Sequence, residues 1–93
     1  MYKMNYEWND EKSHKNMSKH GIDFDTAKAL WDDPNRVEIH ASHPIENRNI
    51  LVGKIGKKLW ASIFTTRGNV IRIISVRRAR KKETILYEQK ENG

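Results

Sequence analysis

Hydrophobic and polar residues alternate along this chain with two different periods, and the order of these periods predicts its elements. Met4, Tyr6 and Trp8 alternate with polar neighbours, which indicates a short first strand. Helical spacing follows, and from residue 37 the period returns to two. The expected order is therefore a strand, two helices, a series of strands and a last helix.

The first predicted helix covers residues 11–20. Asn9 or Asp10 can cap its start, and Gly21 is a typical residue for its end. Its apolar face is thin, so we expect it on the surface with its basic side chains available for contacts.

A second helix is predicted over residues 22–33, with Asp23 as its cap. The Asp33-Pro34 pair is expected to end it, because a proline disfavours helical geometry in the preceding residue. The side chains spaced for contact with the core are Phe24, Ala27, Leu30 and Trp31.

The second half of the chain predicts an antiparallel meander. Its expected strands are residues 37–41, 49–55, 59–66 and 70–76. A final helix is predicted over residues 79–90, with Ile85 and Leu86 facing inward. We therefore expect a single α+β domain, residues 1–93, in which two N-terminal helices and one C-terminal helix pack on an antiparallel sheet.

Residues 67–82 hold seven of the 18 lysines and arginines of the chain and no acid. Between the charges, residues 70–76 are almost continuously apolar, as in a strand buried in a sheet. Buried guanidinium groups are costly when unpaired, so these arginines must emerge at the rim of the sheet or meet an anion. An acid-free arginine cluster suits phosphate groups, while a solvated basic surface with ordinary ion pairs is the alternative interpretation.

Charge and composition narrow the class of partner. The formal net charge is +6, and eight of the 12 acids lie within residues 7–38, away from the basic stretch. This asymmetry favours a polyanionic partner such as nucleic acid, an anionic membrane or an acidic protein. The chain has no cysteine, no bilayer-length apolar run and no visible signal peptide at Met1. We therefore expect a cytoplasmic protein with no membrane association.

Glu83 and Tyr87 form the candidate site that follows the basic stretch. Four residues apart, they share one face of the last helix. In the structural interpretation, Glu83 pairs with Arg77 or Arg80 and holds the helix to the sheet. In the functional interpretation, one of the two moves a proton or orients an arginine beside a phosphate.

The histidines and tryptophans give weaker evidence for a functional site. The four histidines have no spacing that predicts a metal site, and we expect no metal and no cofactor. His20 is interpreted as a favourable charge at a helix end, with proton transfer as the alternative. The three tryptophans are expected in the core, although an exposed one would be able to stack on a base.

Taken together, these residues resemble a known family. The amino-terminal part of the match consists of Trp8, Lys12, Asn16, Lys19-His20-Gly21-Ile22, Phe24 and Ala27. The remainder consists of Arg48, Thr66-Arg67, Arg72-Ile73-Ile74-Ser75, Arg77, Ala79, Glu83 and Tyr87. The chain thereby resembles the BrnT family, the toxins of bacterial type II toxin–antitoxin pairs. Departures from the family pattern are small. Asn9 stands where Asp is commoner, Val76 where Ala is commoner, and Thr84 where a basic residue often follows the Glu.

The resemblance implies a RelE-like fold and a ribonuclease activity that halts translation. It also implies neutralisation by a BrnA-type antitoxin, a DNA-binding protein of the ribbon–helix–helix type, in a hetero-oligomer. Metal-free RNA cleavage uses the 2′-hydroxyl as nucleophile, so the protein must neutralise the phosphorane and move two protons. Arginine is a poor proton carrier because its pKa exceeds about 12.

The predicted site combines the basic stretch with this family motif. Arg67, Arg72 and Arg77 are expected to bind and stabilise the scissile phosphate. Proton carriers or orienting groups are sought among His20, Glu83, Tyr87 and Lys19. The residues expected to bind the RNA strand are Lys12, Lys19, Arg78, Arg80 and Lys81. A non-catalytic RNA or ribosome binder is one alternative, and a basic interface for an acidic antitoxin segment is another.

Overall fold

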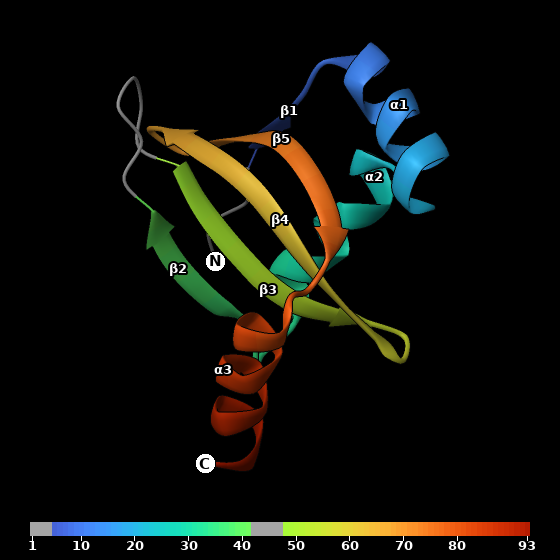
Figure 1. Ribbon diagram of the computed structural model, residues 1–93. Helices are drawn as coiled ribbons and strands as arrows, with labels where there is room; N and C mark the ends of the chain where they lie inside the picture. Colours follow the sequence, from blue (N-terminus) through green and yellow to red (C-terminus); the bar gives the residue numbers. More distant parts are fainter. Residues whose placement is uncertain (1–4, 42–47) are drawn as a thin grey trace.

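The computed structural model describes residues 5–41 and 48–93, so Met4 of the predicted first strand lies outside the described residues. Within these residues the chain forms five strands and three helices, with a 3-10 helix between the second helix and the second strand (Figure 1). In chain order the elements are β1 (Asn5–Glu7), α1 (Asp10–His20), α2 (Phe24–Ala27), η1 (Lys28–Asp32), β2 (Val37–Ala41), β3 (Arg48–Ile55), β4 (Lys58–Arg67), β5 (Val70–Arg78) and α3 (Lys81–Asn92).

The sheet is mixed, with the strand order β1-β5-β4-β3-β2. Strands β2 to β5 pair antiparallel in sequence order, and glycines with φ of 62° and 60° at positions 56 and 68 make the turns on either side of β4. Strand β1 pairs parallel to β5, with Asn5 opposite Val70. The expectation of a purely antiparallel sheet was therefore wrong at this edge. The two-residue period indicates that a segment is a strand but carries no information on its neighbour.

Helix α1 begins and ends as its sequence predicts. The Asn9 side chain accepts a hydrogen bond of 3.1 Å from the backbone of Lys12 and caps the helix. At the other end, Gly21 takes a φ of 79°, and its N–H donates to the carbonyl of Met17.

The contacts that hold α1 to the domain are mainly polar. Its buried side chains are Ser13 and Asn16. The Ser13 hydroxyl accepts from the Phe24 backbone N–H at 3.0 Å. The Asn16 amide donates to the carbonyl of Ile22 at 2.8 Å, and its oxygen accepts from the Val76 N–H at 3.1 Å. One buried side chain therefore joins α1 both to the next segment and to β5.

The second predicted helix is two shorter pieces. Asp23 caps α2 as expected, accepting from the Thr26 N–H at 2.8 Å. After four residues the chain tightens into η1. A close approach accompanies this winding: a Cβ added at Gly53 of β3 would lie 3.2 Å from the Leu30 carbonyl oxygen. The prediction of one continuous helix over residues 22–33 was wrong because contact with β3 overrides the local preference.

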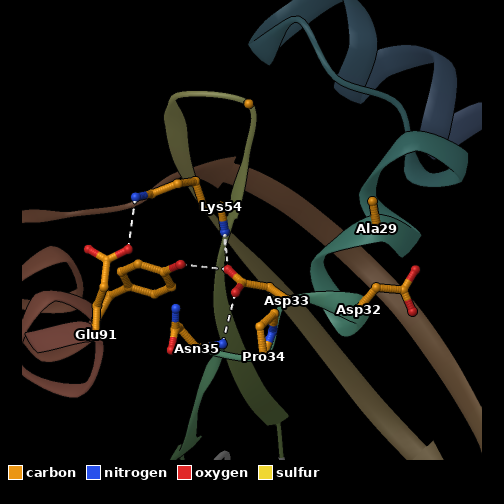
Figure 2. A pocket seen from close by; sticks show the side chains of 9 residues that line it. Ala29, Asp32, Asp33, Pro34, Asn35, Lys54 and Glu91 are labelled. Carbon is orange, nitrogen blue, oxygen red and sulfur yellow. Dashed lines mark hydrogen bonds and ion pairs between the residues drawn. The ribbon is translucent and has the colours of Figure 1, made fainter. Parts of the chain in front are cut away.

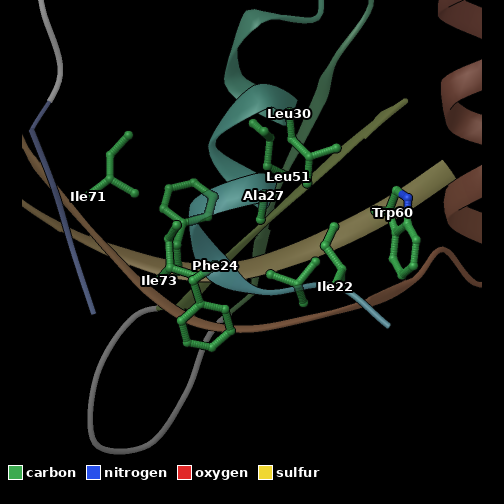
Figure 3. Packing of buried hydrophobic residues seen from close by; sticks show 10 residues of the cluster. Ile22, Phe24, Ala27, Leu30, Leu51, Trp60, Ile71 and Ile73 are labelled. Atoms are coloured by element: carbon green, nitrogen blue, oxygen red, sulfur yellow. The ribbon is translucent and has the colours of Figure 1, made fainter. Parts of the chain in front are cut away.

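Two apolar clusters lie on the two faces of the sheet. The larger cluster packs α2 and η1 on the first face (Figure 3). Its buried members are Ile22, Phe24, Ala27, Leu30, Leu51, Trp60, Phe64, Ile71, Ile73 and Val76. The smaller cluster on the second face has only Val52, Ala61 and Tyr87 as buried members. As expected, all three tryptophans contribute to the larger core, with Trp8 and Trp31 partly buried at its margin.

Helix α3 packs on the second face with the opposite orientation to the one predicted. Its buried residues are Glu83 and Tyr87. Ile85 and Leu86 are 45% and 42% exposed, so the expectation that they face inward was wrong. Glu83 faces inward because it forms an ion pair with Arg77 of β5. Hydrophobic spacing does not encode this long-range contact.

We predict that Asn16→Ala lowers the free energy of unfolding by about 1–3 kcal/mol, because it leaves the buried Val76 N–H without its acceptor. Urea denaturation measures this change. Ser18→Ala, at an exposed position of the same helix, is the matched control and should stay within about 0.5 kcal/mol. Equal effects of the two substitutions would contradict an anchoring role for Asn16.

Candidate functional site

A register shift in β5 brings separated arginines to one face of the sheet. Ser75 is paired with Ile63, but the next pair along β4 is Phe64 with Ile73, so Ile74 is an extra residue. Without this bulge, Arg72 and Arg77 would lie on opposite faces, because their separation is odd. With it, both lie on the second face.

The pairing pattern places a third arginine there. On β4, the partners of Arg77 and Arg72 are Ala61 and Thr65, and Ala61 belongs to the second-face cluster. Arg67 is two residues beyond Thr65, so alternation puts it on the same face. We call this surface, formed by Arg67, Arg72 and Arg77, the arginine face. Successive rows across it are about 7 Å apart. Arg67 therefore lies one row from Arg72, on the neighbouring strand, and Arg77 lies two rows from Arg72 on the same strand.

Helix α3 covers one end of the second face. Its main contacts with the sheet are to β2 and β3, and in Figure 1 it extends away from the lower end of the sheet. Within residues 5–41 and 48–93, no helix lies over the end that carries Arg67 and Arg72, and both side chains are exposed. Half-buried aliphatic residues from neighbouring strands, Ile39, Ile50 and Ile63, lie in the row between Thr65 and Ala61.

Arg77 is held in a bidentate ion pair. Its two terminal nitrogens donate to the two oxygens of Glu83 at 2.7 and 2.8 Å, with side-chain exposures of 19% and 9%. Glu83 also accepts from the backbone N–H of Arg80 at 2.7 Å, which secures the start of α3. These hydrogen bonds, that from Arg77 first, lower the pKa of Glu83 against the opposing effect of burial. The structural interpretation of Glu83 is confirmed in its geometry.

The other two arginines of the face are more exposed than Arg77 and are not held in a buried ion pair. Arg72 meets Glu7 of β1 through a single contact of 3.5 Å, and both side chains are 47% exposed. The side chain of Arg67 makes no hydrogen bond or ion pair with the residues that the structure describes. An incoming anion can therefore reach these guanidinium groups without breaking a buried pair.

The predicted residues on α1 lie elsewhere. Lys12, Lys19 and His20 belong to a helix that contacts β5 and α2, and they do not share the arginine face. Lys19 and His20 lie in the last turn of α1, where positive charge complements the helix dipole.

Arg78 lies on the opposite face from Arg77. It is paired with Trp60 of the first face, and its guanidinium carbon lies 5.5 Å from the centre of that ring. Arg80 and Lys81 are exposed at the start of α3, near the Arg77–Glu83 pair. The basic stretch therefore divides between two faces and a helix end.

The hydroxyl of Tyr87 is hydrogen-bonded to Asp33 and not to an arginine. Tyr87 is 1% exposed, and its hydroxyl donates to Asp33 at 2.7 Å. The same carboxylate accepts from the backbone N–H groups of Asn35 and Lys54, each at 2.8 Å (Figure 2). Burial and this bond raise the pKa of Tyr87, while the three hydrogen bonds outweigh burial and lower the pKa of Asp33.

These groups border a surface pocket of about 410 Å³, which Glu91 also lines. The ammonium of Lys54 contacts the Glu91 carboxylate at 3.1 Å (Figure 2). Hydrogen bonds and an ion pair thus join Asp33, Lys54, Tyr87 and Glu91, and they connect α3 to β3 and to the end of η1.

Two residues of the arginine face were missed from the sequence. Glu7 lies opposite Arg72 only because β1 is parallel to β5, a pairing that no local pattern signals. Thr65, 8% exposed, was detectable because it alternates in step with Arg67.

No helix in residues 5–41 and 48–93 combines the length and hydrophobicity required to traverse a bilayer. Nor do three or more potential metal ligands gather anywhere in those two ranges.

A strongly basic α+β domain with exposed guanidinium groups on one face of its sheet has the charge distribution expected of a protein that meets a polyanion. The family model of the ribonuclease toxin BrnT of type II toxin–antitoxin systems matches residues 8–83. The chain therefore belongs to this family of ribonuclease toxins, as its motifs indicated, and the family implies an antitoxin partner. A search of curated proteins found no match.

We predict that Glu83→Gln lowers the free energy of unfolding at pH 7 by about 2–3 kcal/mol, because charged hydrogen bonds to Arg77 are lost. The pKa of Glu83 is lowered in the folded state, so its contribution is present above the unfolded pKa of about 4.3 and is lost as the pH falls through the folded value. The difference between the two proteins should therefore shrink below about pH 4.

Chemical denaturation at a series of pH values measures this difference. Glu88→Gln, at an exposed position of the same helix, should leave stability nearly unchanged across the range. A Glu83→Gln difference that stays constant down to pH 3 would show that the ion pair is not its cause.

Proposed function

We propose that this toxin is an endoribonuclease that cleaves RNA through the 2′-hydroxyl at the arginine face. The observation that carries the proposal is the alignment of Arg67, Arg72 and Arg77 along one face, with the first two exposed. Guanidinium groups offer forked donors that match a phosphate, and a line of them follows a sugar–phosphate backbone.

The three arginines would contribute in different ways. Arg67 and Arg72 contact the scissile phosphate and stabilise the negative charge of the phosphorane. Arg77, fixed by Glu83, supplies positive charge at the adjacent end of the face and keeps α3 in place. Because these groups provide the charge stabilisation, the proposed reaction is independent of a metal ion, and chelators should not affect it.

Glu7 is the proposed proton acceptor. It lies beside Arg72, is half exposed, and makes only one loose ion pair. Its carboxylate is therefore available to remove the proton of the 2′-hydroxyl when the phosphate binds Arg72. Glu83 is less suited to this role, since both of its oxygens accept hydrogen bonds from Arg77. Tyr87, bonded to Asp33, is assigned to the attachment of α3.

The cellular consequence would follow from the family. RNA cleavage would inhibit translation in the cytoplasm, and a BrnA-type antitoxin of the ribbon–helix–helix type would neutralise the toxin in a hetero-oligomer. The exposed guanidinium groups of the arginine face support RNA cleavage because their geometry matches phosphate, and the family match supports the pairing with an antitoxin.

We predict that Arg72→Gln reduces the rate of RNA cleavage by about 100-fold, because a donor to the phosphorane is removed. A fluorescently labelled RNA incubated with purified protein, with and without EDTA, provides the measurement. Lys57→Gln, which removes one exposed positive charge from the turn before β4, is the control and should cleave normally. The site is misplaced if both variants fold and cleave like the parent.

We predict that Glu7→Gln lowers the cleavage rate by about 100-fold or more while RNA affinity stays the same or increases, because a base and a negative charge are both removed. Single-turnover cleavage and fluorescence anisotropy separate the two effects. A parallel loss of affinity and cleavage would argue against a role for Glu7 as the base.

A second candidate function is non-catalytic binding of RNA or ribosomes. It is favoured by one observation: among the described residues, no second-face position of β1, β4 or β5 holds a histidine, lysine or tyrosine to protonate the leaving oxygen beside Arg67 and Arg72. This candidate predicts salt-dependent RNA affinity with intact strands after long incubation.

A further inference from the structure

Helix α3 carries its most apolar side chains on its exposed surface. A helix on a globular domain normally buries its apolar stripe and exposes its charges. Here Glu83 and Tyr87 are buried, with 7% and 1% exposure, while Ile85 and Leu86 remain about half exposed. Only one other large apolar side chain in the described part of the chain, Met17 of α1, is as exposed. The apolar pair on α3 therefore needs an explanation other than the core of this domain.

The sequence of α3 places this pair in a continuous stripe. At 3.6 residues per turn, Ile85 lies about 200° around the helix from Glu83, and therefore on the outer side. The stripe has the spacing i, i+3, i+4, i+7, which is the spacing of contact positions in helix packing. Its members, which we call the outer stripe of α3, are Lys82, Ile85, Leu86 and Gln89.

The outer stripe is basic as well as apolar. Lys81 and Lys82 precede the apolar pair, and both are exposed. Two of the three acids of α3 are directed elsewhere: Glu83 binds Arg77, and Glu91 binds Lys54. Glu88 lies about 160° around the helix from Leu86 but about 60° from Ile85, so it borders the stripe on one side. The stripe itself carries Lys82 and no acid.

We propose that the outer stripe of α3 is a docking surface for an acidic segment of the antitoxin that inserts apolar side chains against Ile85 and Leu86. This proposal relies on the antitoxin partner implied by the family and is independent of the proposed nuclease site. An apolar centre with a charged rim is the composition of a protein interface, and lysines at that rim match a partner of opposite charge.

Other occupants fit less well. In a symmetric dimer with parallel helices, the stripe would bring Lys81 and Lys82 close to the same lysines of the second molecule. With antiparallel helices, Lys82 would face Gln89, so no member of the stripe would match its charge. RNA would satisfy the lysines but would gain little from two aliphatic side chains, since bases bind aromatic or guanidinium planes. An acidic, apolar protein segment matches both parts of the stripe.

The test is the affinity of the toxin for a purified BrnA-type antitoxin, measured by calorimetry. We expect the double substitution Ile85→Glu, Leu86→Glu to weaken binding by at least about tenfold, because it places charge at the centre of the contact. Lys82→Glu should also weaken binding and reduce its salt dependence. Met17→Glu, at the third exposed apolar residue, is the matched control and should bind normally.

Circular dichroism and thermal unfolding verify that the variants fold, which is expected because both α3 positions are exposed. Unchanged affinity of the double variant, or an equal loss in Met17→Glu, would overturn the proposal. So would a dimer of toxin alone that the double variant disrupts, or a loss of RNA affinity with antitoxin affinity intact. Failure of the parent to cleave RNA would overturn the nuclease proposal and leave this measurement valid.

Discussion

The arrangement of the second face depends on one extra residue in β5. The bulge at Ile74 lets Ile73 and Val76, three residues apart, both enter the larger core. It also places Arg72 and Arg77 together on the other face. A regular strand would have to bury one of these arginines or expose one apolar partner, and both outcomes are costly. Packing of the core and assembly of the arginine face are therefore two results of the same backbone irregularity.

Polar contacts hold both terminal helices to the sheet. Asn16 joins α1 to β5, and Glu83 joins α3 to Arg77. Tyr87 adds a bond to Asp33, which in turn accepts from two backbone N–H groups. Such bonds specify an orientation more sharply than apolar burial does, because an unmade buried hydrogen bond is penalised. A small domain with a modest second-face core thereby positions its helices without large apolar contacts.

The sequence predicts the local elements well because their signals are local. The cap at Asn9, the stop at Gly21 and the strands after residue 37 all depend on neighbouring residues. The errors involve distant partners: β1 pairs with β5, η1 tightens against Gly53, and Ile85 and Leu86 face outward on the helix whose inner side binds Arg77. The candidate site follows the same rule. The arginines were identifiable from composition, whereas the contribution of Glu7 and the separation of Arg78 required the topology.

The hydrogen bond from the Val76 N–H to Asn16 also bears on the tendency of the protein to aggregate. Among the described residues, β1 pairs with residues 70–72 of β5, so the later part of β5 has no strand beside it at this edge of the sheet. Exposed strand margins invite pairing with other chains and lead to aggregation. The side-chain oxygen of Asn16 accepts the hydrogen bond of the Val76 N–H at this edge, and α1 lies against β5. A side chain that fixes a helix thus also shields the sheet from unwanted association with neighbouring molecules.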